Sequence, residues 1–154
     1  MKKLKVYIAS PFFNKEQIER LTLVENEIEP RFDAYSPRKQ TQFKSGTKPD
    51  KKLRQLILDS NLYAIENSDF VIAITDDKDL GTLFEVGYAY AIGKPIIYVA
   101  FTLGERPFNL MLSETGVAVL KTLSEVRTVA DSIIKNGIYD NTQLKKFQYE
   151  GLIE

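Results

Sequence analysis

One carboxylate stands out in an otherwise apolar segment. Residues 79–95 read DLGTLFEVGYAYAIGKP, and from Thr82 to Ile92 every side chain except Glu85 is apolar, small or aromatic. A helix that is apolar all round is buried, so Glu85 is expected to lose water. Burial of an unpaired carboxylate is costly, and it usually accompanies a raised pKa or a functional use. The alternative is a carboxylate that reaches solvent or pairs with a Lys or Arg. Its position after the loop that follows the third predicted strand, where a ligand crevice is expected, favours a function.

Three further carboxylates precede this helix. Asp76, Asp77 and Asp79 lie in the loop DDKDLG, and such clusters commonly cap helices and form turns. If one of them faced Glu85, the two groups would form the carboxyl pair that glycosyl chemistry uses. The segment GTLFEVG lacks the glycine spacing of a dinucleotide fingerprint, and no phosphate-binding P-loop occurs.

The composition excludes several classes of chemistry. The 154 residues include no Cys and no His, which excludes disulfides, imidazole bases and sites with His or Cys metal ligands. Lys and Arg together number 21, as do Asp and Glu, so no net charge draws the chain to nucleic acid or to a membrane. The apolar runs are too short for a signal peptide or a membrane span, and we expect a cytoplasmic protein.

Strand-like and helix-like segments alternate along the whole chain. This pattern predicts one domain over residues 1–154, with a doubly wound, flavodoxin-like α/β fold: a five-stranded parallel sheet with helices on both faces. The polar loop 38–50 and the tail 139–154 show no strong period. The predicted strands are 3–9, 32–37, 69–75, 94–100 and 116–120, and the main helices are 14–30, 51–66, 79–95 and 123–136, with a short helix near 110.

The carboxyl ends of the strands are the expected position of the site. In such sheets ligands bind where the strand order reverses, so the loops that begin at Ser10, Ser36, Asp76 and Phe101 are candidates. The first of them contains Phe12, whose ring could form the floor under a flat base or belong to the core.

Three motifs resemble one enzyme family. VYIASPFF at the first strand, DLGTLFEVGYAYAIGKP around Glu85 and PFNLM after the fourth strand resemble the nucleoside 2-deoxyribosyltransferases. The likeness extends from Val6 to FQYEG in the tail. It implies that Glu85 attacks C1′ of a 2′-deoxynucleoside and forms a covalent deoxyribosyl ester, which a second base then attacks with overall retention.

The resemblance also implies roles for other residues. Tyr7 matches the tyrosine that orients the nucleophile, and Asp79 matches the aspartate near the sugar 3′-hydroxyl. Asn109 and Met111 match residues that reach the sugar 5′-hydroxyl region from a neighbouring subunit, which implies a homo-oligomer with sites at subunit interfaces. Deoxynucleosides and free nucleobases are the implied partners, and neither a cofactor nor a metal is implied.

Two positions depart from the family pattern. Members usually carry NDL where this chain has SNL, which puts Asn61 in place of an aspartate that handles the base. Asn cannot protonate a leaving base, so that proton would come from Asp59, a loop residue or solvent. The family commonly ends in Tyr, whereas this sequence has Glu154 there. Gln40 or Gln42 of the polar loop is the candidate for base recognition.

Two other functions remain open at this point. The same fold and nucleophile could hydrolyse deoxynucleosides or their 5′-monophosphates, and a non-catalytic nucleotide sensor could have lost turnover. The loop that contains Asn109 favours a substrate with a free 5′-hydroxyl, although the nearby Arg106 could bind the phosphate of a 5′-monophosphate. Asn61 favours the sensor, while the set of Tyr7, Asp79 and Glu85 favours an active enzyme.

Overall fold

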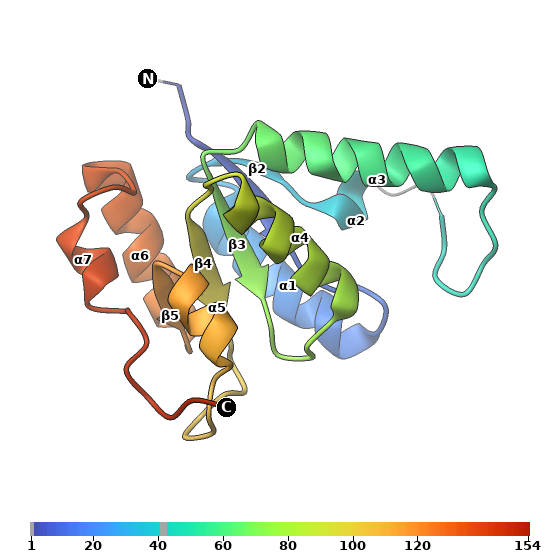
Figure 1. The fold of residues 1–154 in the computed structure, drawn as a ribbon. Coiled ribbons are helices and arrows are strands. Elements are labelled where there is room, and N and C mark those ends of the chain that lie inside the picture. Colours follow the sequence, from blue (N-terminus) through green and yellow to red (C-terminus); the bar gives the residue numbers. More distant parts are fainter. Residues whose placement is uncertain (1, 41–42) are drawn as a thin grey trace.

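The computed structural model describes residues 2–40 and 43–154, and its centre is a parallel sheet (Figure 1). Within these residues the sheet has five strands in the order β2-β1-β3-β4-β5, and every pairing is parallel. The predicted doubly wound, flavodoxin-like arrangement is confirmed, and the order reverses between β1 and β3. The strands are β1 (Lys5–Ala9), β2 (Asp33–Tyr35), β3 (Phe70–Ile74), β4 (Ile96–Val99) and β5 (Ala118–Leu120).

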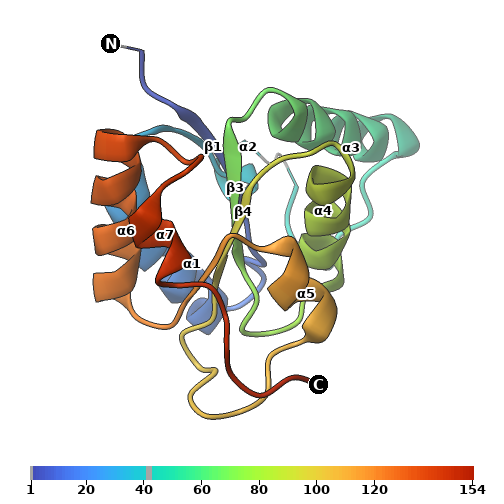
Figure 2. The ribbon, with the colours of Figure 1, turned by 60° about the vertical axis from the view of Figure 1, so that its left-hand side comes forward.

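Helices cover both faces of this sheet. Figure 2 shows α3, α4 and α5 on one side and α1, α6 and α7 on the other. The helices are α1 (Lys15–Ile28), α2 (Pro37–Gln40), α3 (Lys51–Glu66), α4 (Leu80–Ala91), α5 (Leu110–Thr115), α6 (Leu123–Asn136) and α7 (Thr142–Lys145). Among the described residues, none of these helices has the length and apolar character needed to span a membrane.

Local sequence accounts for the helix ends. The predicted cap Asn14 accepts a hydrogen bond from the backbone N–H of Gln17, and Asp50 caps α3 in the same way. The short helix α2 begins at Pro37, the last residue of the strand predicted over 32–37, which in fact ends at Tyr35, and α7 lies in the tail that shows no period. Pro37 opens α2 with a backbone angle already suited to a helix, and Asn141 caps α7. A single turn is too short to produce a detectable period.

Successive side chains of β1 point to opposite faces of the sheet and enter two different core layers. Val6 and Ile8 pack in the layer with α1 and α6, whereas Tyr7 and Ala9 pack in the layer with α4. Tyr7 is fully buried there. The sheet therefore directs this tyrosine toward the helix that carries Glu85.

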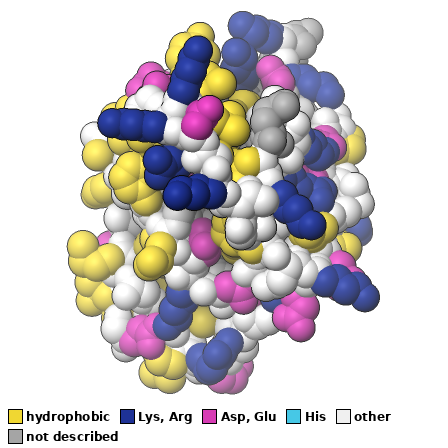
Figure 3. Space-filling model, turned by 90° about the vertical axis from the view of Figure 1, so that its right-hand side faces the viewer, with side chains coloured by type: hydrophobic (Ala, Val, Ile, Leu, Met, Phe, Trp, Pro, Cys, Tyr) yellow, Lys and Arg dark blue, Asp and Glu magenta, His cyan; other side chains and the backbone are white. Residues whose placement is uncertain are grey.

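The expectation that α4 is buried all round is wrong for the single chain. Val86 and Ala89 are buried against the sheet, but Leu80 is 83% exposed and Phe84 is 57% exposed on the outer side. An apolar composition alone therefore does not show that every side of a helix is covered by its own chain. On the face shown in Figure 3, basic and acidic side chains are interspersed and hydrophobic side chains gather along one edge.

Candidate active site

Tyr7 and Glu85 meet although 78 positions separate them in the sequence. The Tyr7 hydroxyl donates a hydrogen bond to Glu85 Oε2. β1 holds the tyrosine rigidly in the core, and the second turn of α4 brings the carboxylate to it. The contact fixes one oxygen of Glu85 and leaves Oε1 as the atom that can approach a ligand.

Burial sets the electrostatics of Glu85. The loss of water raises the pKa of this carboxyl from 4.5 to about 8. The hydrogen bond from Tyr7 favours the ionised form, because a carboxylate accepts from a hydroxyl more strongly than a neutral acid does. The raised pKa of Glu85 means that its protonated form predominates at neutral pH and that its ionised form increases as pH rises.

A second tyrosine connects this pair to Asn61. Tyr35 is the register partner of Tyr7 in the sheet, and the two rings stack with centroids 5.6 Å apart and planes 15° apart. The Tyr35 hydroxyl donates to Asn61 Oδ1 at 3.3 Å, and burial raises the pKa of Tyr35. The sequence analysis missed Tyr35. The available signal was its place in the second predicted strand, because a flavodoxin-like strand order puts that strand beside the first.

The base-recognition candidates border one hollow. Asn61, Asp59 and Gln40 line an open cavity of about 640 Å³ together with Tyr35. Asp59 accepts a hydrogen bond from Gln55 Nε2 at 2.9 Å. The structure therefore brings Gln40 and Asn61 together, while the other glutamine candidate, Gln42, lies outside the described residues.

Asp79 lies directly before the helix that carries Glu85. Its Oδ2 accepts hydrogen bonds from the backbone N–H of Thr82 at 2.8 Å and from Thr82 Oγ1 at 3.0 Å, which makes it the N-cap of α4. Asp79 therefore caps a helix, as loop aspartates commonly do. The cap also fixes where α4 begins, and so where Glu85 lies.

The other two loop aspartates are engaged away from Glu85. Asp76 accepts from the backbone N–H of Thr102 at 2.7 Å, and its carboxylate lies 3.9 Å from Arg20 Nε. Asp77 forms an ion pair with Arg20 at 3.1 Å. These contacts tie the β3–α4 loop to α1 and to the loop after β4, so neither aspartate forms a carboxyl pair with Glu85 within the chain.

The remaining candidates lie on other surfaces. Asn109 caps α5 by accepting from the backbone N–H of Leu112 at 3.2 Å, and it borders a cavity whose lining does not include Glu85. Met111 is 67% exposed. Phe12 packs against the core layer of α1 and α6, with its ring 5.2 Å from that of Phe13. Within one chain these three residues are not gathered around Glu85.

Across residues 2–40 and 43–154, no three acidic side chains converge in a way that could hold a metal ion. The Tyr7–Glu85 pair is a carboxylate held by a hydroxyl, and such a carboxylate can perform nucleophilic attack or proton transfer.

Comparison with known proteins agrees with this chemistry. A model of the nucleoside 2-deoxyribosyltransferase family matches residues 6–126, which is most of the chain. The chain belongs to the nucleoside 2-deoxyribosyltransferase family. The resemblance seen in the sequence is thereby confirmed, and the match includes Tyr7, Asp79 and Glu85. A search of curated protein sequences found no match.

Three solved structures are also similar to this chain. A 2-deoxyribosyltransferase from Bacillus psychrosaccharolyticus is 26% identical, with a TM-score of 0.77 over 95% of this chain and 99% of that one. A conserved protein from Enterococcus faecalis V583 (18% identity, TM-score 0.55, 94% and 98% coverage) shares the fold. So does a CMP N-glycosidase from Clostridium botulinum (18% identity, TM-score 0.54, 82% and 98% coverage).

Proposed function

We propose that this protein exchanges bases on 2′-deoxynucleosides through a covalent deoxyribosyl ester on Glu85. The observation that carries the proposal is the Tyr7–Glu85 contact, in which a buried hydroxyl aims a partly desolvated carboxylate. Membership of the nucleoside 2-deoxyribosyltransferase family supports the substrate class. A carboxylate suits this chemistry because it stabilises an oxocarbenium-like transition state and then forms the ester.

The reaction proceeds in two displacements. The ionised Glu85 attacks C1′, the bond between C1′ and the base nitrogen breaks, and the electron pair leaves with the base, which takes up a proton. An incoming base then attacks C1′ from the face that the first base left, loses its own proton and releases Glu85. Two inversions give overall retention, and ping-pong kinetics follow.

The other residues position the substrate. We assign the sugar 3′-hydroxyl region to Asp79 and base recognition to Gln40 and Asn61, which border one hollow. Asn61 can donate and accept hydrogen bonds but cannot supply the proton of the leaving base. Asp59 lies on the same hollow and is the nearest acidic candidate in the sequence, with solvent as the other source.

The exposed apolar side chains of α4 and α5 support a site shared between subunits. Leu80 and Phe84 on α4 and Leu110 and Met111 on α5 are between 48% and 83% exposed. Contiguous exposed apolar side chains commonly mark an interaction surface. In a homo-oligomer, Asn109 and Met111 of one subunit would reach the Glu85 site of another, as the family resemblance implies.

A single incubation tests the proposal. Thymidine and adenine are incubated with the protein, and chromatography quantifies deoxyadenosine, thymine and free deoxyribose, beside a control without adenine. Formation of deoxyadenosine that requires both adenine and an intact Glu85 is the expected result. If Glu85→Gln forms deoxyadenosine at the wild-type rate, the assignment of the nucleophile is wrong.

Hydrolysis is the second candidate, and one feature favours it. Glu85 is only half-buried in the chain, so water can reach this carboxyl group and act as the acceptor. The same incubation separates the two functions. Thymine and deoxyribose that accumulate without deoxyadenosine would identify an N-glycoside hydrolase.

A further inference from the structure

A buried carboxylate on α1 has no part in the chemistry proposed above. Glu25 is only 1% exposed, and its helix covers the opposite face of the sheet from α4 (Figure 2). Glu25 Oε1 accepts hydrogen bonds from Ser36 Oγ at 2.6 Å and from Arg38 Nε at 3.0 Å, while its Oε2 accepts from Arg38 Nη2. The same Arg38 nitrogen donates to Thr22 Oγ1 at 3.1 Å. Arg38 therefore binds both oxygens of the carboxylate through its planar fork.

The partners of Glu25 come from the segment that follows β2. Ser36 and Arg38 flank Pro37, the first residue of α2, and Gln40 is the last residue of this four-residue helix. A helix of one turn is not stable on its own, so its position depends on contacts with the rest of the protein. The Glu25 carboxylate supplies such contacts on both sides of Pro37 and thereby holds α2 against α1.

The other end of α2 lies at the site. Gln40 lines the hollow that Tyr35 and Asn61 also border. Tyr35 directly precedes Ser36 in the chain, and its ring stacks on that of Tyr7. The segment 35–40 therefore connects the Glu25 contact to the candidate residue for base recognition.

The burial of this ion pair indicates a use other than stability. Buried ion pairs often contribute little net stability, because dehydration of the two charges offsets their attraction, and in some proteins they instead fix one arrangement of the chain. The guanidinium of Arg38 is rigid and planar, so its two bonds to Glu25 set the orientation of α2 as well as its distance from α1.

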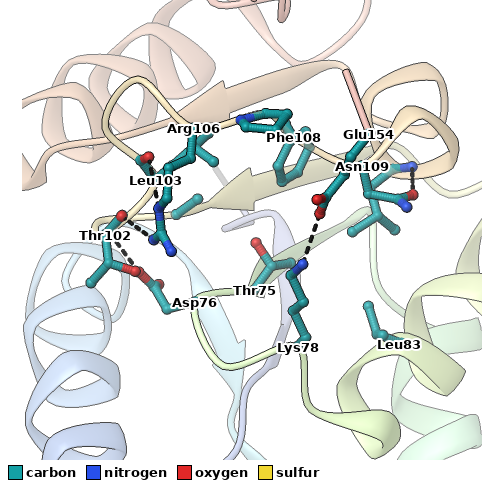
Figure 4. Close-up of a pocket in the computed structure, with 13 residues that line it drawn as sticks. Thr75, Asp76, Lys78, Leu83, Thr102, Leu103, Arg106, Phe108, Asn109 and Glu154 are labelled. Carbon is teal, nitrogen blue, oxygen red and sulfur yellow. Dashed lines mark hydrogen bonds and ion pairs between the residues drawn. The ribbon is translucent and has the colours of Figure 1, made fainter. Parts of the chain in front are cut away.

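The loop after β3 is anchored in a comparable way. Asp76, whose side chain is 1% exposed, accepts a hydrogen bond from the backbone N–H of Thr102 at 2.7 Å (Figure 4). This contact holds the loop that leads to Asp79 and Glu85. Buried carboxylates therefore hold two of the loops at the carboxyl ends of the strands, the one after β2 and the one after β3.

We propose that Glu25 is a positioning residue for base recognition: through Arg38 and Ser36 it fixes α2 so that Gln40 meets the base. This inference rests on the proposed function and on the assignment of Gln40 to the base. Glu25 itself does not touch the substrate, so its replacement should weaken binding of the base and leave the chemistry at Glu85 intact. Loss of a contact made equally to substrate and transition state raises KM and leaves kcat unchanged.

A double-mutant cycle between Glu25→Gln and Gln40→Ala tests the proposal, with kcat and KM measured for adenine as acceptor and thymidine as donor. Glu25→Gln keeps the size of the side chain but removes the charge that holds Arg38. Each single variant should raise the KM for adenine about three- to tenfold, while kcat stays within about twofold of the wild type. Because both changes remove the same contact with the base, the KM of the double variant should stay within about twofold of that of Gln40→Ala.

Glu27→Gln is the matched control. Glu27 lies on the same helix and also binds two arginines, Arg31 and Arg127, but the second of these belongs to α6 and neither belongs to α2. Its replacement should leave the KM for adenine unchanged. Arg38→Lys is an independent variant that keeps the test decisive if Glu25→Gln does not fold. Lysine keeps the positive charge but lacks the planar fork, so the KM for adenine should rise here too.

The possible results separate this inference from the proposed function. An unchanged KM in Glu25→Gln and Arg38→Lys, an unchanged KM in Gln40→Ala, an equal rise in Glu27→Gln, or effects of Glu25→Gln and Gln40→Ala that multiply would each overturn the positioning role while base exchange persists. Absence of base exchange in the wild-type protein would refute the proposed function, and the role in base recognition with it. Circular dichroism verifies that every variant compared is folded.

Discussion

Replacement of Glu85 by Gln tests the buried carboxylate through the stability of the protein as well as through its activity. Gln has nearly the same shape and can still accept the hydrogen bond from Tyr7, but it cannot ionise. In the wild type, burial raises the pKa of Glu85 from 4.5 to about 8. The folded state therefore binds a proton more tightly than the unfolded state does.

The sign and size of the effect follow from this shift. The pKa of Glu85 is about 4.5 in the unfolded chain and about 8 in the folded protein, so between these pH values the folded state binds more protons. The free energy of unfolding therefore falls as pH rises from about 4.5 to about 8 and is then level. The slope approaches about 1.4 kcal/mol per pH unit, so wild type should lose about 3 kcal/mol between about pH 5.5 and about pH 8.5. Glu85→Gln should lack this loss.

Urea unfolding followed by circular dichroism measures the difference, since the chain has no Trp for fluorescence. The protein concentration is held constant, because association would otherwise change the apparent stability. Glu105→Gln, which changes an exposed loop carboxylate, is the matched control and should follow the wild type. A difference between Glu85→Gln and wild type that stays flat over this pH range would refute the argument that loss of water raises the pKa of Glu85.

Four further results are expected. The kcat/KM of base exchange should rise with pH and level off only above the Glu85 pKa of about 8, because the protonated Glu85 cannot attack; a profile that is flat from about pH 6 upward would contradict this. Asn61→Asp should increase exchange several-fold if protonation of the leaving base limits the rate, and an unchanged rate would assign that step elsewhere. Tyr35→Phe keeps the stacked ring but removes the donor to Asn61, so kcat/KM should fall by up to about tenfold while the exposed control Tyr139→Phe is unaffected. Specific activity should fall on dilution if Asn109 is supplied by a neighbouring subunit, and concentration-independent activity would exclude that arrangement.

The fold was predictable because its signals are local. Buried parallel strands are near-continuous apolar runs, and helices repeat their apolar residues every three or four positions, so the order of elements could be derived from the sequence. Caps such as Asn14 are equally local. The one-turn helices α2 and α7 were missed for the same reason, because they are shorter than any period.

The sequence predicted the central carboxylate of the site, but not how the residues around it are oriented. Glu85 was conspicuous because a carboxylate in an apolar helix conflicts with its context. The direction of Asp76 toward Arg20 and Thr102 could not be derived from spacing, since it depends on which loops meet at the end of the sheet. The same holds for Tyr35, whose importance comes from its register with Tyr7.

The register of the sheet also explains why fold and site depend on each other. Val6 and Ile8 must face the core of α1 and α6, and this fixes Tyr7 on the opposite face, where α4 lies. A shift of β1 by one residue would turn Tyr7 away from Glu85 and would at the same time expose the apolar set that holds the strand in place. The contact that aims the nucleophile is therefore specified by the burial of its two neighbours. Substitutions of Val6 or Ile8 should affect catalysis only to the extent that they disturb this register.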